Sequence, residues 1–306
     1  MCTAIKDAHL FGRTLDLAES YGEQVVISPR RYPFFFTHEG KSTNHHAIIG
    51  TAHISAGVPL YYDAMNEKGL CIAALRFYPL SCYHEKQDGK HAVASFELIP
   101  WLLCNCSDAE EAKRLSGNTS ITSDRFSSKL PSAPLHWMVA DEKESFVIES
   151  TADGIKIYDN SIGVLTNAPA FPDQLQGIAS DILLSRRTDY TDNASIPGAL
   201  SSTARFQRVL DAKSKTEPTT NEDEAISRFF HILGTVNQPD GVWRTEEMQP
   251  MRTVYTSCMD TARQIYFFTT YTCRQIRGVR LKNAHLDLDT LTAFPMAREE
   301  WFHYCN

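Results

Sequence analysis

The sequence predicts an α+β protein in which antiparallel β-sheets are covered by helices. Strand-like and helix-like segments are gathered in separate blocks along the 306 residues, whereas a parallel sheet would need the two kinds of segment to alternate. Neither an internal repeat nor a linker rich in Gly, Pro or Ser interrupts the chain. We therefore expect a single domain that spans residues 1–306.

The N-terminal third is expected to be β-sheet. Residues 2–17 contain two strand-like segments on either side of a turn at Lys6-Asp7. Short, apolar, β-rich segments separated by Gly, Pro or Asn follow at 24–28, 47–54, 60–65 and 70–77. The segment Met-Asn-Glu-Lys-Gly-Leu at 65–70 predicts a hairpin turn, because Asn and Gly are turn formers.

Helical and β blocks follow in the rest of the chain. Residues 95–104 predict a helix, and Ser107-Asp108-Ala109-Glu110 matches a capping box before a second helix that ends near Gly117. The expected strands are 135–150, 154–158, 162–166, 252–259, 264–271 and 275–281. The expected helices are 174–185, 204–213 and 222–233, with a polar loop from 187 to 203.

Charge and hydropathy exclude several classes of protein. The formal net charge is −7 and the pI is about 5.9, and the basic residues form no cluster of the kind that nucleic-acid phosphates require. The first fifteen residues contain no apolar core of a secretory signal, and no apolar run is long enough to cross a bilayer. We expect a cytoplasmic protein without nucleic-acid or membrane partners.

The eight cysteines are expected to be free thiols. They are scattered along the chain without a CxxC pair, and no signal directs the chain to an oxidising compartment. Cys104 and Cys106 are too close in sequence for a usual zinc pair, and no second pair accompanies them. The patterns HExxH, GxxxxGK[ST] and GxGxxG are absent. The sequence therefore predicts neither a metal site nor a cofactor.

Cys2 is the first candidate for chemistry. A cell removes Met1 when the second residue is small, which leaves Cys2 with a thiol and a free α-amine. Because the reference pKa of an α-amine is about 7.7–8.0, this amine is partly unprotonated at neutral pH and can take the thiol proton. One residue would then supply both the nucleophile and the base.

The residues after Cys2 fit this interpretation. If the two predicted strands pair, Arg13 and Asp16 return beside Cys2, where an Arg stabilises a thiolate and an Asp can orient the α-amine. The same spacing also fits a surface ion pair. The possible bases of a papain-like Cys–His pair are His53, His84, His136 and His231. No cysteine lies in the local signature of that class.

A set of short motifs occurs in a fixed order along nearly the whole chain. The motifs are Met1-Cys2-Thr3, Phe11-Gly12-Arg13 with Asp16, and the segments 65–70, 135–137 (LHW), 163–169 (GVLTNAP), 204–206 (ARF), 229–233 (FFHIL) and 255–259 (YTSCM). In this order they resemble the choloylglycine hydrolase family, which holds bile salt hydrolases and penicillin V acylases. The resemblance implies a four-layer αββα sandwich of the N-terminal-nucleophile hydrolase type, which cleaves amide bonds without a metal or organic cofactor.

The resemblance also implies the roles of individual residues. Cys2 matches the nucleophile of the family, and Arg13 and Asp16 match the Arg and Asp beside it. Asn167 matches the Asn whose side-chain NH₂ stabilises the oxyanion, a role that suits a pre-placed amide donor. Arg205 matches the Arg at the rear of the site. A homo-oligomer, a tetramer in relatives, is expected as well.

Three segments depart from the family pattern. Arg76 stands where relatives have Asn or Tyr, and its main-chain N–H can still complete the oxyanion hole. Its side chain would either favour an anionic substrate or point away to an ion pair. Ile196-Pro197-Gly198-Ala199 replaces Leu-Pro-Gly-Asp, after a loop shortened to Thr188–Ser195, which leaves substrate preference and assembly open. Pro172-Asp173-Gln174 stands where relatives have an aromatic residue and a His.

The leading hypothesis is hydrolysis of the amide between a sterol carboxyl group and glycine or taurine, through a thioester on Cys2. The apolar pocket for such a substrate could be formed by Phe34, Phe35, Phe36, Tyr61 and Tyr62. One alternative is an acylase of the same mechanism that acts on penicillin V or N-acyl homoserine lactones. Another is a non-catalytic sterol- or acyl-binding protein on the same scaffold, which retention of Met1 would favour.

Overall fold

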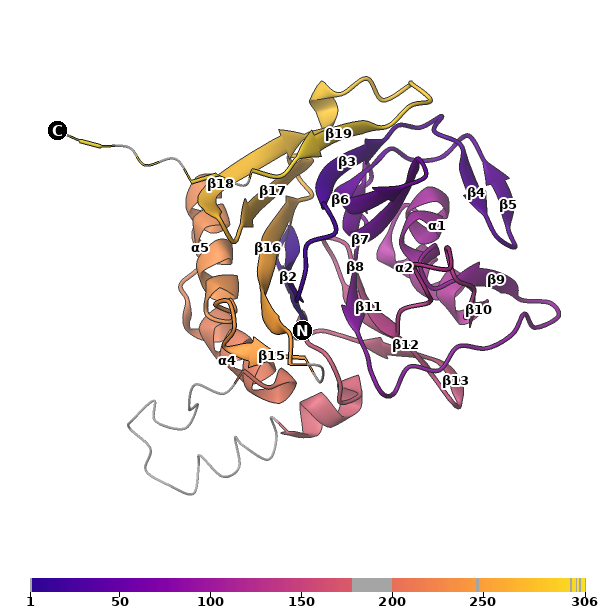
Figure 1. Ribbon diagram of the computed structural model, residues 1–306, viewed down its shortest axis with the longest axis horizontal. Helices are drawn as coiled ribbons and strands as arrows, with labels where there is room; N and C mark the ends of the chain where they lie inside the picture. The colour runs from indigo at the N-terminus through magenta and orange to yellow at the C-terminus, as the bar shows by residue number, and fades with distance from the viewer. Residues whose placement is uncertain are drawn as a thin grey trace.

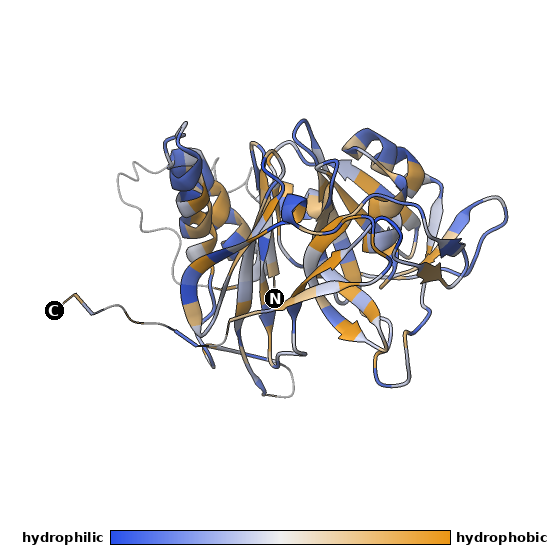
Figure 2. Cartoon of the chain, turned by 90° about the horizontal axis from the view of Figure 1, so that it is seen from above, coloured by the Kyte–Doolittle hydropathy of each residue, from blue (hydrophilic) through white to orange (hydrophobic). Residues whose placement is uncertain are grey.

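Two large antiparallel sheets pack face to face, and helices cover the outer side of each sheet (Figure 1). The computed structural model describes residues 2–177, 200–245, 248–297, 299–300, 302 and 304–305. Seen from above, the sheets stand side by side between the two helical layers (Figure 2). The expected α+β class and its αββα layering are confirmed.

The first sheet contains the N-terminal strand. Its strands follow the order β14-β1-β2-β16-β17-β18, and the short β15 pairs with β16. Their bounds are Val164–Leu165 (β14), Cys2–Asp7 (β1), Leu10–Leu17 (β2), Pro250–Asp260 (β16), Ile265–Thr270 (β17), Cys273–Arg280 (β18) and Trp243–Arg244 (β15). At Gly12 a Cβ would lie 2.0 Å from the backbone oxygen of Ser257. Glycine at this position therefore lets β2 and β16 approach closely.

The central strands of the second sheet are buried on both faces, whereas the edge strands are partly exposed. Its order is β13-β12-β11-β8-β7-β6-β3-β19. The bounds are Gly154–Asp159 (β13), Ser145–Thr151 (β12), Leu135–Ala140 (β11), Cys71–Arg76 (β8), Val58–Asn66 (β7), Ile48–Ser55 (β6), Gln24–Ser28 (β3) and Thr292–Pro295 (β19). Ala73 and Leu75 join the core between the sheets, whereas Ile72 and Ala74 join the core beneath the helices. Burial of alternate residues on opposite faces explains the unbroken apolar run of β8.

The helices lie outside the two sheets. The helices α1 (Leu98–Asn105) and α2 (Ala109–Gly117) cover the second sheet, and α4 (Ser202–Lys215) and α5 (Glu222–Gly234) cover the first (Figure 1). Residues 171–177 are helical too. The small elements are β4 (Phe34–Phe36) with β5 (Gly40–Ser42), β9 (His91–Ala94) with β10 (Thr119–Thr122), and the 3₁₀ turn η1 (Leu281–Asn283).

The expected capping box is displaced by one residue. Asp108, and not Ser107, caps α2, since its side chain accepts a hydrogen bond of 2.9 Å from the backbone N–H of Glu111. The carboxylate of Glu111 in return accepts from the backbone N–H of Ser107 at 2.7 Å. The arrangement resembles a capping box with Asp and Glu as its two side chains, except that Glu111 bonds the N–H of the residue before the N-cap.

Two other boundaries differ from the sequence-based expectations. The first turn lies at Ala8-His9, because β1 continues through Asp7. The strand β19 was not expected, since it is a short edge strand with three exposed residues among its four. Most of the residues expected to form the polar loop, including the shortened stretch 188–199, lie outside the described residues, as do residues 178–185 of an expected helix.

Candidate active site

Cys2 begins β1 and lines a pocket between the two sheets, which we call the inner pocket. Pairing of β1 with β2 sets Cys2 opposite Leu15. Cys2 is only 4 % exposed, and Arg13 and Asp16 of β2 line the same pocket. The N-terminal hairpin thus brings these three predicted residues together, as antiparallel pairing of the two strands requires.

The carboxamide of Asn167 lies beside the backbone nitrogen of Cys2. The Cys2 N–H donates to Asn167 Oδ1 at 2.7 Å, and Arg205 Nη2 donates to the same oxygen at 2.8 Å. Asn167 Nδ2 donates to the backbone oxygen of Arg76 at 2.7 Å. These contacts fix which side of the carboxamide carries oxygen, and they leave the second hydrogen of Nδ2 for another acceptor.

Arg205 holds the backbone of β1 from behind. Its side chain is fully buried, and Nη1 donates to the backbone oxygen of Cys2 and, at 2.7 Å, to Thr3 Oγ1. Nε donates to the backbone oxygen of Leu200 at 3.2 Å. Burial lowers the pKa of Arg205, although it stays far above neutrality because guanidinium groups do not lose their charge in proteins. A fixed cation therefore lies directly behind the thiol-bearing residue.

Arg13 is the second buried cation of the site. Nη1 donates to the backbone oxygens of Tyr62, at 3.2 Å, and of Ala74. Nη2 has no hydrogen-bond partner among the described residues, although it is buried and the side chain lines the inner pocket. Burial by itself lowers the pKa of Arg13, but the neighbouring acidic groups, Cys2 first among them, raise it further than burial lowers it.

Asp63 is a buried acid that the sequence did not single out. It lies in β7, and its carboxylate accepts from the hydroxyls of Tyr255, Ser257 (2.6 Å) and Tyr266 (2.8 Å). The Ser257 hydroxyl also accepts from the backbone N–H of Arg13 at 3.2 Å. Burial raises the pKa of Asp63, whereas Arg13 and the three donors lower it. This network joins the two sheets beneath Arg13.

Asp16 is held by β16. Its Oδ1 accepts from the hydroxyl of Thr253 at 2.7 Å, and that hydroxyl accepts from the backbone N–H of Gln238 at 2.7 Å. Burial raises the pKa of Asp16, and Arg205, the Thr253 hydroxyl and Arg13 each lower it. A β-bulge between Thr253 and Tyr255 shifts the pairing of β16 with β2 at this point.

Gln174, noted in the sequence as a departure from the family, is a support for Asn167. It is 1 % exposed, and Nε2 donates to the backbone oxygens of Asn167 (2.7 Å) and Pro169 (2.8 Å). Ser202 Oγ donates to the same Asn167 oxygen at 2.8 Å. The backbone carbonyls of Asn167 and Pro169 are therefore held by side chains from the helical residues 171–177 and, at Asn167, from α4 as well.

Arg76 ends β8 at the edge of the inner pocket. Its guanidinium is exposed, with Cζ 5.2 Å from the ring centroid of Tyr78. Phe77 N donates to the backbone oxygen of Pro134 at 2.8 Å, so Phe77 forms the hydrogen-bonded pair with β11. In an antiparallel ladder the preceding residue turns its N–H and C=O the other way. The N–H of Arg76 therefore faces the side on which Asn167 meets the Arg76 carbonyl.

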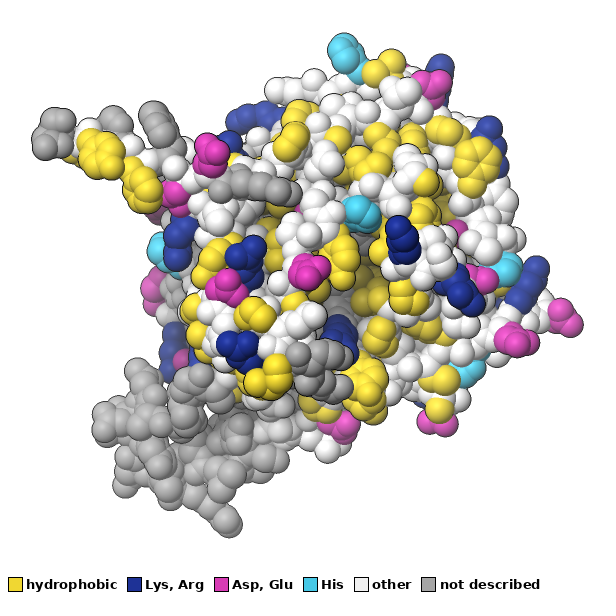
Figure 3. Space-filling view, viewed as in Figure 1, with side chains coloured by type: hydrophobic (Ala, Val, Ile, Leu, Met, Phe, Trp, Pro, Cys, Tyr) yellow, Lys and Arg dark blue, Asp and Glu magenta, His cyan; other side chains and the backbone are white. Residues whose placement is uncertain are grey.

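The inner pocket is mostly apolar. Its volume is about 500 Å³. The apolar lining includes Leu15, Leu60, Tyr61, Tyr62, Phe96, Ile99, Phe126, Leu130 and Trp137. Among the described lining residues Asp16 is the one acid, against the three cations Arg13, Arg76 and Lys129. A hollow with hydrophobic side chains around it is visible between the two halves of the molecule (Figure 3).

Some candidate residues lie elsewhere. Of the proposed pocket aromatics, Tyr61 and Tyr62 line the inner pocket, whereas the prediction for Phe34, Phe35 and Phe36 is wrong, because these three line a neighbouring hollow. Of the histidines, His53 lines the inner pocket with its ring against Tyr21 (centroids 6.3 Å apart). The other three do not: His84 contacts the Thr151 oxygen, His136 contacts Glu149, and His231 lies on α5.

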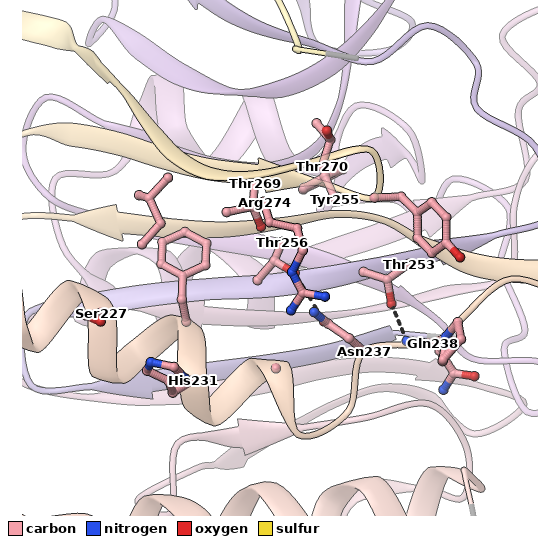
Figure 4. Close-up of a pocket in the computed structure, with 15 residues that line it drawn as sticks. Ser227, His231, Asn237, Gln238, Thr253, Tyr255, Thr256, Thr269, Thr270 and Arg274 are labelled. Carbon is pink, nitrogen blue, oxygen red and sulfur yellow. Dashed lines mark hydrogen bonds between the residues drawn. The ribbon is translucent and has the colours of Figure 1, made fainter. Parts of the chain in front are cut away.

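A larger hollow, the outer groove, lies between α5 and the strands β16–β18 (Figure 4). Its volume is about 750 Å³. Its polar lining includes Ser227, His231, Asn237, Gln238, Thr253, Thr256, Thr269, Thr270 and Arg274. In Figure 4 the Arg274 side chain extends toward Asn237. No cysteine is among the described lining residues, so His231 does not face a thiol there.

Two further features are absent from the part of the chain that the structure describes. Within them, no three His, Cys, Asp or Glu side chains are grouped so that they could hold a metal ion. No helix among the described residues has both the length and the apolar character needed to cross a membrane.

Known proteins resemble the chain over its full length. The family model described as linear amide C–N hydrolases, choloylglycine hydrolase family, matches residues 1–294. The bile salt hydrolase/transferase of Lactiplantibacillus plantarum is 40 % identical over 324 aligned positions, which cover all of both chains. The bile salt hydrolase/transferase of Clostridium perfringens is 32 % identical over 311 positions, which cover 94 % of each chain.

Two solved structures also match the chain over most or all of its length. The C2A mutant of conjugated bile acid hydrolase from Clostridium perfringens matches with a TM-score of 0.91 at 28 % identity, over the whole of both chains. Penicillin V acylase from Agrobacterium tumefaciens matches with a TM-score of 0.79 at 20 % identity, over 96 % of this chain and 90 % of that one, a likeness of fold. These matches define the class of protein, a hydrolase that acts on linear amide C–N bonds. Within this class, the chain belongs to the choloylglycine hydrolase family.

Proposed function

We propose that this enzyme hydrolyses the amide bond of glycine- or taurine-conjugated bile salts, with Cys2 as its nucleophile. The observation that carries the proposal is the position of Cys2 in an apolar pocket of about 500 Å³, beside two buried guanidinium groups and a fixed carboxamide. A volume of this size suits a ligand such as a sterol acid. The relatives at 40 % and 32 % identity that carry the name bile salt hydrolase/transferase support the same substrate.

The first half of the reaction would form a thioester. After removal of Met1, the α-amine of Cys2 takes the proton of its own thiol. The thiolate sulfur attacks the amide carbon, and the carbonyl π electrons move onto oxygen. The tetrahedral intermediate then collapses: the C–N bond breaks, and the amine leaves with the proton that the α-amine carried. The acyl group remains on Cys2 as a thioester.

The second half would return the free enzyme. A water molecule gives a proton to the α-amine of Cys2 and attacks the thioester carbon through its oxygen. A second tetrahedral intermediate collapses with cleavage of the C–S bond, and the thiolate recovers a proton. The α-amine would occupy the place of the present Cys2 nitrogen, 2.7 Å from Asn167 Oδ1. That contact would orient the amine lone pair for both proton transfers.

The oxyanion would be held by two donors. Asn167 Nδ2 uses one hydrogen for the Arg76 carbonyl and keeps the other for the substrate oxygen. The backbone N–H of Arg76 faces the same side, because the next residue, Phe77, is the one that bonds to Pro134 and neighbouring residues of a strand alternate. Donors fixed before the reaction need no reorganisation when charge develops on oxygen. In this proposal Gln174 and Ser202 position Asn167 and do not touch the substrate.

The two buried cations and Asp16 would stabilise the thiolate of Cys2 and hold its backbone and α-amine in place. Arg13 lowers the energy of the thiolate, because its charge is buried and its Nη2 is free of partners among the described residues. Arg205 fixes the carbonyl of Cys2 and the oxygen of Asn167 at once. Asp16, as a carboxylate, would hold the α-amine of the mature N-terminus in place.

The side chain of Arg76 would attract the anionic end of the substrate. The sterol occupies the apolar interior, so the carboxylate or sulfonate of the amine part must stay near solvent, where a charge keeps its hydration. Arg76 is an exposed cation at that edge, and Lys129 adds a second. We expect Arg76→Gln to raise KM for conjugated bile salts several-fold at low salt and to do so less at high salt, because exposed ion pairs are screened.

The test is amine release from glycocholate, taurocholate and penicillin V by protein whose intact mass lacks Met1. Release of glycine or taurine, together with an acyl adduct on the Cys2 peptide under rapid quench, is the expected result. Release from penicillin V alone would mean that the same mechanism acts on a different acyl group and not on bile salts. Protein that keeps Met1, binds bile salts and releases no amine would make it a non-catalytic binding protein.

A further inference from the structure

Two buried polar side chains, His136 of the LHW motif and Glu149, form a pair that the proposed chemistry does not use. They are direct cross-strand partners on β11 and β12, with Nδ1 of His136 3.2 Å from Oε1 of Glu149. Both side chains are fully buried. The next pair on the same face, Met138 and Val147, belongs to the apolar core between the sheets. Since a buried ionisable pair is often no more stabilising than two apolar side chains, folding alone does not explain it.

The Glu149 end of the pair holds the helical residues 171–177. The same Oε1 accepts from the backbone N–H of Phe171 at 2.9 Å, one of the N–H groups that the first turn of a helix leaves without a helical partner. Gln174, in the same helical segment, donates to the backbone oxygen of Asn167 at 2.7 Å. Glu149 is therefore joined to the backbone of Asn167 through two hydrogen bonds and one short helical segment.

The His136 end of the pair holds the end of β8. Its imidazole stacks on the ring of Phe77, with the centroids 4.4 Å apart and the ring planes 10° from parallel. Phe77 is fully buried, yet it belongs to neither of the two large apolar clusters. It directly follows Arg76, whose backbone oxygen accepts from Asn167 Nδ2 at 2.7 Å. The pair thus contacts, one at each end, both of the segments that meet at this hydrogen bond.

We propose that His136 and Glu149 are positioning residues, which fix the distance between the two oxyanion donors, Asn167 Nδ2 and the backbone N–H of Arg76. Neither is among the described residues that line the inner pocket, so both act through other groups and not on the substrate. The two donors must reach the same oxygen, and a displacement of about 1 Å in such a site can lower the rate about 100-fold. This inference rests on the oxyanion site of the proposed function and adds two residues to it.

Substitutions of the pair test this role by amine release. Glu149→Leu removes the acceptor that Phe171 and His136 share, and it should lower kcat about 10–100-fold with KM changed no more than about threefold, because donor alignment matters mainly in the transition state. Glu149→Gln keeps an acceptor oxygen in the same place and should retain kcat within about threefold of wild type. His136→Leu removes the stacked ring and should lower kcat as Glu149→Leu does.

Stability has to be measured separately from positioning. Met138→Ala, on the same face of β11, leaves a cavity and should lower the unfolding temperature, yet it should change kcat by no more than about threefold. The double variant His136→Leu/Glu149→Leu leaves neither polar side chain buried without its partner, so it should unfold at a higher temperature than either single variant. Its kcat should remain as low as theirs. Recovery of kcat together with the unfolding temperature would show that the pair only stabilises the fold, and it would overturn the proposal.

A readout without turnover distinguishes this proposal from the proposed function. The side-chain amide signal of Asn167 in nuclear magnetic resonance, identified by its absence from Asn167→Ala protein, reports the surroundings of the donor in any folded variant. It should shift in Glu149→Leu and His136→Leu and stay in place in Glu149→Gln and Met138→Ala. A signal that keeps its wild-type position in both Leu variants would overturn the positioning role. A shifted signal in a protein whose wild type hydrolyses no amide would support that role and contradict the proposed function alone.

Discussion

The inner pocket and the outer groove border the same strand, β16, yet they differ in kind. The inner pocket is the smaller, about 500 Å³ against about 750 Å³, and has apolar walls around a buried thiol and a buried guanidinium. The outer groove is lined by hydroxyl and carboxamide groups with an exposed cation, Arg274. The inner pocket is therefore distinguished from the outer groove not by its size but by charges that are buried and held by specific partners, a feature typical of functional sites.

The strand between the two hollows explains how they differ. Thr253 and Tyr255 line the outer groove, but their hydroxyls donate to Asp16 and to Asp63. The same two residues of β16 thus border the outer groove and, through their hydroxyls, hold the buried carboxyl groups of the inner pocket. Substitutions at equivalent chemical groups in the two hollows should consequently have very different effects.

The largest expected difference is between Cys2→Ala and His231→Ala. Loss of the proposed nucleophile should lower kcat by about 10⁵–10⁶-fold, because Cys2 is the one cysteine among the described residues that line the inner pocket. His231→Ala, in the outer groove, should change kcat by no more than about twofold. Steady-state amine release measures both. If the Cys2→Ala protein turns over substrate at close to the wild-type rate, Cys2 is not the nucleophile.

The next comparison is between two asparagines. Asn167→Ala should lower kcat by about 10²–10³-fold with a smaller change in KM, because an oxyanion donor acts mainly in the transition state. Asn237→Ala, in the outer groove, should leave both parameters unchanged. Thermal unfolding must accompany the assay, since Asn167 also joins Cys2, Arg76 and Arg205. A folded Asn167→Ala enzyme with wild-type kcat would exclude the carboxamide as a donor.

Substitutions of Thr253 test whether the hydrogen bond from β16 to Asp16 affects the reaction. Burial raises the pKa of Asp16, and the Thr253 hydroxyl opposes that shift by stabilising the carboxylate. Thr253→Val should therefore raise the Asp16 pKa further, by roughly one unit, since a hydrogen bond to a charged group contributes about 1.5–3 kcal/mol. If the carboxylate is the active form, the acidic limb of the kcat–pH profile moves to higher pH.

The control at this position is Thr253→Ser, which keeps the hydroxyl and should restore the profile of the wild type. If the acidic limb of the kcat–pH profile stays at the same pH in folded Thr253→Val protein, the ionisation of Asp16 does not limit the reaction. A limb that moves in both variants would point to packing in the outer groove as its cause.

The smallest expected effect is on stability. Tyr266→Phe removes one donor to Asp63 and leaves Thr51 Oγ1 without its 2.6 Å partner, which should cost about 1–3 kcal/mol in the free energy of unfolding. A buried acid with a raised pKa loses stability as pH rises from its unfolded value, about 3.9, through its folded value. The loss in Tyr266→Phe should thus be larger at neutral pH than near pH 4.

Urea unfolding at the two pH values measures this loss. Tyr271→Phe, whose hydroxyl accepts from Asp240 N at 3.1 Å at the exposed edge of the outer groove, should change stability by less than about 0.5 kcal/mol. Equal losses in the two variants would show that the buried network under Arg13 is no stronger than a surface contact.

Several parts of the fold follow from local chemistry. The turn at 65–70 forms as expected: Asn66 Oδ1 accepts from the backbone N–H groups of Lys68 and Leu70, and Gly69 has a φ of +92° that favours glycine. The proximity of Cys2, Arg13 and Asp16 likewise follows from one hairpin. Such features depend on contacts between residues near in sequence, and sequence patterns report those well.

Asn167 and Arg205 needed the family resemblance, because no spacing rule relates them to Cys2, 165 and 203 positions away. Asp63, Thr253 and Gln174 were not predicted as supports of the site. Asp63 did leave a signal, as a lone acid within the apolar strand β7. No comparable signal distinguishes a threonine in a strand or a glutamine after a proline, since both residues are common on surfaces.

The sequence by itself determined the class of fold and the hairpin that carries Cys2, and it led to the proposal that one N-terminal residue combines a nucleophile and a base. It did so because hydrophobic periodicity, turn chemistry and the pKa of an α-amine are local properties. The tertiary structure alone decided which distant polar groups are buried together, which of two hollows they face, and that Phe34–Phe36 line a hollow beside the inner pocket. Burial and partner choice depend on how the sheets pack, and that packing sums many contacts between residues far apart in the chain.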